Sequence, residues 1–430
     1  MDSIKIRHAG TFLLLLTLAV IRPEGFYPGI GLPVGPLCLL AALAIVPWKI
    51  HSTLGFTEFW KRYQRPLLLI LSYQLLCTTS LLYNIDRYAD LAEFFRWGVV
   101  FIAGQMLLPL CIFIFLLPSE AAKTRRFSRV FMLGLGISVI PASVLLQVYF
   151  PGIAAVVIQY FVGGDIIWIN HTIRGVLATS TDLGAISAIL CWTALALASY
   201  NARDTRKVAI IFALWSVLFA YVGILSASRN FILFIAIATV TIVFATLWVK
   251  QRILIAPTLL GLTSLFYALA YTLPNELLYK LGRFIPYFEK VRTDAEISLK
   301  DLLPHASFES LGPRAPLWES TLKLMADNPL IGISNGGFRL ADNCSCYRGN
   351  THNILFQSAI DAGVMGLIVI SLILGFVINK SAQDKWMLSL VVGIVATLMV
   401  DNFTDHSYAW IVIASFTGVM LYRQGHHKSA

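Results

Sequence analysis

The stretch VAIIFALWSVLFAYVGILSASRNFILFIAIATVTIVFATLWV (208–249) decides the fold class of this chain of 430 residues. Two apolar runs, each long enough for a membrane-spanning helix, flank a short connection that contains Arg229. The rest of the chain is also rich in apolar residues, since 57% of all residues are apolar and only 13% are charged. A soluble domain has about twice that share of charge. The composition excludes a soluble enzyme, a disordered chain and a disulfide-stapled secreted domain, and it predicts an all-α integral membrane protein.

Apolar windows of about 20 residues predict twelve membrane-spanning helices. They are expected at 10–21, 33–48, 66–83, 94–117, 129–149, 177–199, 208–226, 231–249, 253–273, 354–378, 386–401 and 409–422. With this alternation, nineteen Lys and Arg residues fall in the connections on one side and five in the short connections on the other. Because basic residues are enriched in cytoplasmic loops, both termini are predicted to be cytoplasmic. Topology thus explains most of the net charge of +10, and no nucleic-acid partner is expected.

One outer connection is much longer than the others. We expect a loop subdomain over 274–353, between membrane helices 1–9 (1–273) and membrane helices 10–12 (354–430). Its PRAPLWESTLKLMADNP stretch (313–329) predicts a short helix, opened by Pro316 and stopped before Pro329. Two further loop residues, Cys344 and Cys346, are as compatible with a disulfide as with free thiols.

Charged side chains at the outer membrane boundary are the natural candidates for chemistry. Arg229 is either an anchor at a helix end or a cation that binds a ligand beside small neighbours. His352 lies where the long loop meets the tenth span; a lone histidine is more often structural, but a neutral imidazole there could take a proton from an alcohol. The predicted topology puts Arg229, Arg314 and His352 on the same side. Arginines with a general base suit a phosphorylated donor that is anchored in lipid.

At these residues the sequence resembles the bacterial O-antigen ligases, within the wider O-antigen ligase and polymerase superfamily. Arg229 and Leu233 match the family's motif of arginine, three residues and leucine. His352 and Gly363 match its motif of histidine, ten residues and glycine.

The long loop carries the rest of the resemblance. Arg314 and Trp318, followed by NPLIGISNGGF (328–338), are similar to the family's loop pattern. Asp361 stands where the family usually has a glutamate, which shortens the acid and keeps its charge. The detailed match covers about 225–370.

The resemblance implies a GT-C-like membrane fold and a metal-independent, inverting glycosyltransferase of lipopolysaccharide biosynthesis that needs no cofactor. The donor would be a glycan on undecaprenyl pyrophosphate, and the acceptor a sugar hydroxyl of lipid A–core oligosaccharide. The site would face the periplasm from the bacterial inner membrane. His352 would be the catalytic base, and Arg229, Arg314 and, by a looser match, Arg174 would bind the pyrophosphate.

Two other functions compete with this interpretation. An O-antigen polymerase would use a second undecaprenyl-linked glycan as its acceptor, and no motif specifies the acceptor. A transporter or lipid flippase would also have twelve spans, but it needs ionisable groups near the middle of the membrane. Asp182 is one candidate for such a group. Most other charges gather at the outer boundary, which favours chemistry at the membrane surface.

Overall fold

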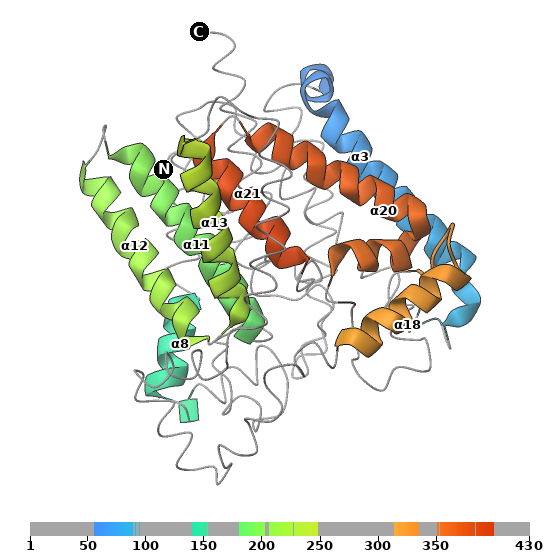
Figure 1. Ribbon diagram of the computed structural model, residues 1–430, viewed down its shortest axis with the longest axis horizontal. Coiled ribbons are helices and arrows are strands. Elements are labelled where there is room, and N and C mark those ends of the chain that lie inside the picture. The colour runs from blue at the N-terminus through green and yellow to red at the C-terminus, as the bar shows by residue number, and fades with distance from the viewer. Residues whose placement is uncertain are drawn as a thin grey trace, which may run out of the picture. The chain divides into compact units, whose positions relative to one another are not determined.

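The structure is a computed structural model, and it describes residues 56–88, 91, 94, 140–150, 152–153, 180–202, 206–226, 228–247, 314–334, 351, 353–382 and 384–399. Within these ranges the chain forms helices and no strand (Figure 1). The helices are α3 (Phe56–Tyr83), η1 (Ile85–Arg87), α8 (Ile140–Tyr149), α11 (Ser180–Asn201), α12 (Arg206–Leu225), α13 (Arg229–Leu247), α18 (Arg314–Asp327), α20 (Ile354–Ser381) and α21 (Lys385–Leu398).

Most of the predicted spans that fall on described residues coincide with a helix. The spans expected at 177–199, 208–226, 231–249, 354–378 and 386–401 correspond to α11, α12, α13, α20 and α21, with ends that differ by a few residues. The predicted span 129–149 ends with α8. Both termini lie outside the described residues, as do the spans predicted at 10–21, 33–48, 94–117 (apart from Phe94), 253–273 and 409–422.

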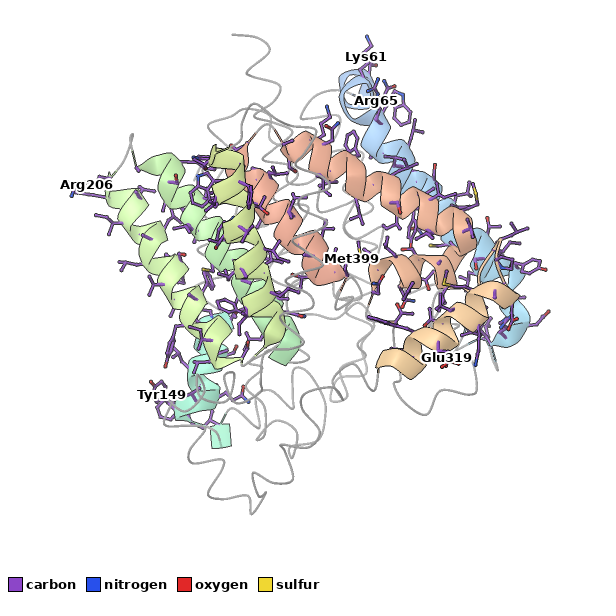
Figure 2. All side chains as sticks on the ribbon, viewed as in Figure 1. Lys61, Arg65, Tyr149, Arg206, Glu319 and Met399 are labelled. Carbon is purple, nitrogen blue, oxygen red and sulfur yellow. The ribbon has the colours of Figure 1, made fainter. Side chains whose placement is uncertain are left out.

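The prediction was too short for α3, which begins ten residues before the expected 66–83. Its first turns, FTEFWKRYQR (56–65), are too polar to be predicted as part of a membrane span from mean hydropathy. Most of these residues are nevertheless acceptable helix formers. Lys61 and Arg65 are exposed there and mark this end of α3 in Figure 2. The helix is therefore longer than its apolar part.

Three of the described helices are long and apolar enough to cross a membrane. They are Leu183–Tyr200 within α11, Arg206–Leu225 (α12) and Ile354–Ser381 (α20). α12 exposes a row of large apolar side chains, namely Ile210, Ile211, Leu214, Val217, Tyr221 and Ile224. Such a row suits a lipid-facing helix surface, since lipid chains are as apolar as these residues.

The chain forms two compact units, which are described separately. The first comprises Met1–Gly134, Leu317–Ser381 and Leu398–Ala430, and the second Leu135–Pro316 and Ala382–Thr397. In the first unit, α3 and α20 pack along each other (Figure 1). The buried Tyr73 hydroxyl on α3 donates a hydrogen bond to Ser358 Oγ on α20 at 2.9 Å, which fixes the register of this pair.

α20 is broken near its first quarter. Ala362 and Gly363 have non-helical backbone angles, so Ile354–Asp361 and the longer remainder point in different directions (Figure 1). We call Ile354–Asp361 the first segment of α20. It carries the polar residues of the helix start, and the remainder carries the long apolar run.

In the second unit, α11 packs against both α12 and α13. α11 is buried over most of its length. Trp192 Nε1 on α11 donates to Ser389 Oγ on α21 at 2.8 Å. A side chain at Gly393 of α21 would meet the ring of Phe234 on α13, so these two helices approach closely. Small residues permit this approach, as is common between membrane helices.

Candidate functional site

The structure describes the surroundings of the four predicted site residues to different extents. Arg229 is the first residue of α13, and Arg314 is the first residue of α18; their side chains are not described. His352 and Arg174 lie outside the described residues. Thr351 and the residues from Asn353 onward, on either side of His352, are described.

Thr351 is held through both of its main-chain polar groups. Its N–H donates to Gln357 Oε1 at 3.1 Å, and its carbonyl accepts from Trp318 Nε1 at 3.1 Å. Thr351 is fully buried. These two bonds join the residue before His352 to the first segment of α20 and to α18.

Asn353 caps α20. Its Oδ1 accepts from the N–H groups of Leu355 and Phe356 at 2.9 and 3.2 Å, which satisfies two of the donors that a helix start leaves unpaired. Its Nδ2 donates to the carbonyl of Met399 at 3.0 Å, and Met399 is labelled in Figure 2. The residue after His352 is thus fixed as well. Asn353, the first residue after the histidine of the motif, is therefore the N-cap of α20.

α18, which begins at Arg314, packs against the residues that flank His352. Pro316 lies in its first turn, where the missing N–H costs nothing. The Trp318 ring packs edge to face on Phe356 of α20, with ring centres 5.9 Å apart. Arg314 precedes Trp318 by one helical turn. The predicted short helix is therefore confirmed, with a start two residues before Pro316.

The turn that follows α18, Asn328–Ser334, replaces the hydrogen bond that α20 loses at its break. Val364 N–H donates to the Pro329 carbonyl at 2.8 Å, and Ile333 N–H donates to the Ile360 carbonyl at 2.7 Å. In an unbroken helix Val364 and Ile360 would bond to each other. We call Asn328–Ser334 the docking turn.

Two glycines permit this contact. Gly332 and Gly363 have φ angles of 75° and 66°, which residues with a Cβ atom rarely adopt. A Cβ on Gly363 would meet the main chain of Leu330, and one on Gly332 would meet the Ile360 carbonyl. The glycine of the histidine motif and the glycine of the loop pattern are therefore explained by the approach of one backbone to another.

The end of α3 also holds the docking turn. Asn84 Nδ2 donates to the Gly332 carbonyl at 3.2 Å, and the hydroxyls of Tyr88 and Ser334 are hydrogen-bonded at 2.7 Å. Asn84 and Ser334 are buried. Sequence analysis missed these residues because their partners are more than 240 positions away.

Arg229 follows a tight turn between α12 and α13 in the second unit. Ser228 Oγ accepts from Asn230 N–H at 3.3 Å, and Ser226 Oγ accepts from Ser228 N–H at 3.2 Å. A Cβ on Gly184 of α11 would meet Ser228, so α11 lies directly against this turn. The small residues that the sequence places beside Arg229 thus serve to pack its backbone.

A comparison with protein families matches residues 214–371 to the family described as O-antigen ligase. Residues 214–371 belong to the O-antigen ligase superfamily. A comparison with curated proteins gave no match.

The O-antigen ligase segment contains all of α13 and α18, the docking turn and most of α20. Three of the predicted site residues, Arg229, Arg314 and His352, lie inside it, whereas Arg174 lies outside. Together with the apolar helices, this membership indicates a bacterial integral membrane protein with glycosyltransferase-type activity on O-antigen. The Asn353 cap, the docking turn and Gly363 hold the part of this segment that surrounds α20.

Proposed function

We propose that the protein is an O-antigen ligase of the bacterial inner membrane. It transfers a glycan from undecaprenyl pyrophosphate to a sugar hydroxyl of lipid A–core oligosaccharide on the periplasmic side. The observation that carries this proposal is that one family-matched segment encloses Arg229, Arg314 and His352. The hydrogen bonds that fix Thr351 and Asn353 support it, because a general base must be held in place to act.

His352 acts on the acceptor in this proposal. Its imidazole takes the proton of the acceptor hydroxyl while the hydroxyl oxygen attacks the anomeric carbon of the donor sugar. The bond between that carbon and the pyrophosphate oxygen breaks, and the electron pair leaves with undecaprenyl pyrophosphate. Attack opposite to the leaving group inverts the anomeric configuration.

Arginines act on the donor. Arg229, Arg314 and Arg174 bind the pyrophosphate oxygens, and their fixed positive charge stabilises the negative charge that develops on the leaving group. Two of these residues stand at helix starts, where the free N–H groups of the backbone also favour an anion.

Reconstitution tests the proposal directly. The purified protein is placed in vesicles with an undecaprenyl-linked glycan and lipid A–core, and the products are separated by mass. Glycan on lipid A–core supports a ligase. A longer undecaprenyl-linked chain would identify a polymerase instead, and no product with either acceptor would reject the proposed activity.

Arg229→Lys is expected to lower kcat/KM for the donor at least about tenfold, although it keeps the charge. Lysine cannot form the paired hydrogen bonds that a guanidinium makes with phosphate oxygens. Arg206→Lys, at the exposed start of α12 (Figure 2), is the matched control and should behave as wild type. Near-normal transfer by Arg229→Lys would make Arg229 a membrane anchor.

Chelators should leave the transfer rate unchanged, because guanidinium groups supply the charge that a metal ion would otherwise supply at the pyrophosphate. The measurement is the initial rate in vesicles before and after treatment with EDTA. A loss of rate that added Mg²⁺ or Mn²⁺ restores would contradict this expectation.

A further inference from the structure

Two polar residues of the first segment of α20 are buried beside each other. Gln357 and Asp361 are 5% and 1% exposed. They are four positions apart on one helix face, and Gln357 Nε2 donates to Asp361 Oδ1 at 2.8 Å. The other end of the same amide, Gln357 Oε1, accepts from Thr351 N–H at 3.1 Å. The chain of hydrogen bonds thus runs from a buried carboxylate to the residue before His352.

Asp361 determines which way the Gln357 amide points. If the amide turned over, its NH₂ group would face the N–H of Thr351, and its oxygen would face the carboxylate. The contact with Thr351 would then be repulsive, as would the contact with Asp361 in its ionised form, and a buried group that loses its hydrogen bond is costly. The carboxylate therefore keeps the acceptor end of Gln357 on Thr351.

The orientation of Thr351 passes directly to His352. The Thr351 carbonyl belongs to the peptide group whose nitrogen is that of His352, and this group is planar. Trp318 Nε1 holds that carbonyl from α18, while Gln357 holds the Thr351 N–H from α20. Two elements thereby set the direction in which the chain enters His352.

We infer that Gln357 and Asp361 are positioning residues, which hold the backbone at Thr351 so that His352 meets the acceptor hydroxyl. This inference rests on the proposed function, in which His352 is the general base. Positioning residues of this kind act on the rate of the chemical step. A displacement of about 1 Å at a reacting group lowers the rate by up to ~100-fold.

Gln357→Leu removes both hydrogen bonds with little change in size. We expect kcat to fall roughly 10- to 100-fold, with KM for the undecaprenyl-linked donor unchanged, because the pyrophosphate is bound elsewhere. Ser358→Ala is the matched control. It removes two buried hydrogen bonds of the next residue, the one from Tyr73 and the one to the Ile354 carbonyl, so it should lower the melting temperature and leave kcat unchanged.

An exchange of donor and acceptor separates positioning from simple loss of stability. Gln357→Glu places two carboxyl groups against each other; once both are ionised at alkaline pH they repel, so kcat measured at that pH should fall as it does in Gln357→Leu. The double variant Gln357→Glu/Asp361→Asn restores one donor and one acceptor. In this variant the carboxylate at position 357 would accept from Thr351 N–H with one oxygen and from the amide at position 361 with the other. We therefore expect kcat to recover toward the wild-type value.

The outcomes are distinct. Recovery in the double variant, with KM unchanged throughout, supports the inference. Wild-type kcat in Gln357→Leu, or a double variant no better than Gln357→Glu, would overturn it while wild-type transfer still supported the proposed function. Absence of transfer by the wild-type protein would reject the function itself and, with it, the inference.

Discussion

Replacement of His352 by alanine is expected to abolish glycan transfer while the protein still folds and inserts into the membrane. A sugar hydroxyl is a weak nucleophile at neutral pH, and a positioned base that takes its proton accelerates attack by roughly 10²–10⁴. Thr351 and Asn353 are held through Trp318, Gln357 and the Met399 carbonyl, and none of these bonds uses the side chain at position 352.

The measurement is the initial rate of glycan transfer in vesicles, normalised to the amount of inserted protein. His426→Ala is the matched control, because His426 follows the last predicted span, on the side predicted to be cytoplasmic. The control should retain full activity. Transfer by His352→Ala at more than a small fraction of the wild-type rate would refute the assignment of the base.

Gly363→Ala is expected to destabilise the protein by at least about 3 kcal/mol. The backbone at Gly363 has φ 66° and ψ −164°, a region that is nearly exclusive to glycine and costs other residues about 1–3 kcal/mol. The added methyl group would also meet the main chain of Leu330. Because this neighbour is backbone, it cannot turn aside as a flexible side chain could. The docking turn would be pushed off α20, with loss of the bonds to Ile360 and Val364.

Thermal unfolding of the detergent-solubilised protein measures this effect. Gly375→Ala, on the same helix, is the control, because a Cβ there would meet no atom within 4 Å beyond the backbone of its own helix turn. Alanine is the better helix former by about 0.5–1 kcal/mol, so this variant should melt at or slightly above the wild-type temperature. Equal melting temperatures for the two variants would show that the break at Gly363 does not constrain the fold.

The apolar helices could be predicted because their signal is local. The run 208–249 divides into α12 and α13 between Leu225 and Arg229, and each predicted span differs from its helix by a few residues. The break in α20 could not be predicted in the same way. Glycine is frequent in membrane helices, and Gly363 differs from Gly375 in its backbone angles and in the backbone that approaches it, neither of which the local sequence shows.

The candidate site was predictable in its residue types and not in its arrangement. Asn353 and Trp318 lie within motifs that sequence analysis singled out, but the bond from Trp318 to Thr351 joins positions 33 apart. Gln357 was overlooked, although it lies four residues before Asp361 at the start of an apolar helix. Buried polar side chains need hydrogen-bond partners. Two polar residues four positions apart in an apolar helix are therefore a sequence signal for a buried hydrogen-bonded pair.

The two ends of the 335–350 segment are fixed points in the fold. The chain leaves Ser334, which is bonded to Tyr88, and returns at Thr351, which is bonded to α18 and α20. The cost of closing a loop rises only by about 0.6 kcal/mol for each doubling of its length. Insertions, deletions or an inserted epitope in 335–350 can therefore change the length of this stretch without changing the separation of its ends. The contacts of Thr351 and Asn353 are in this sense independent of the length of segment 335–350.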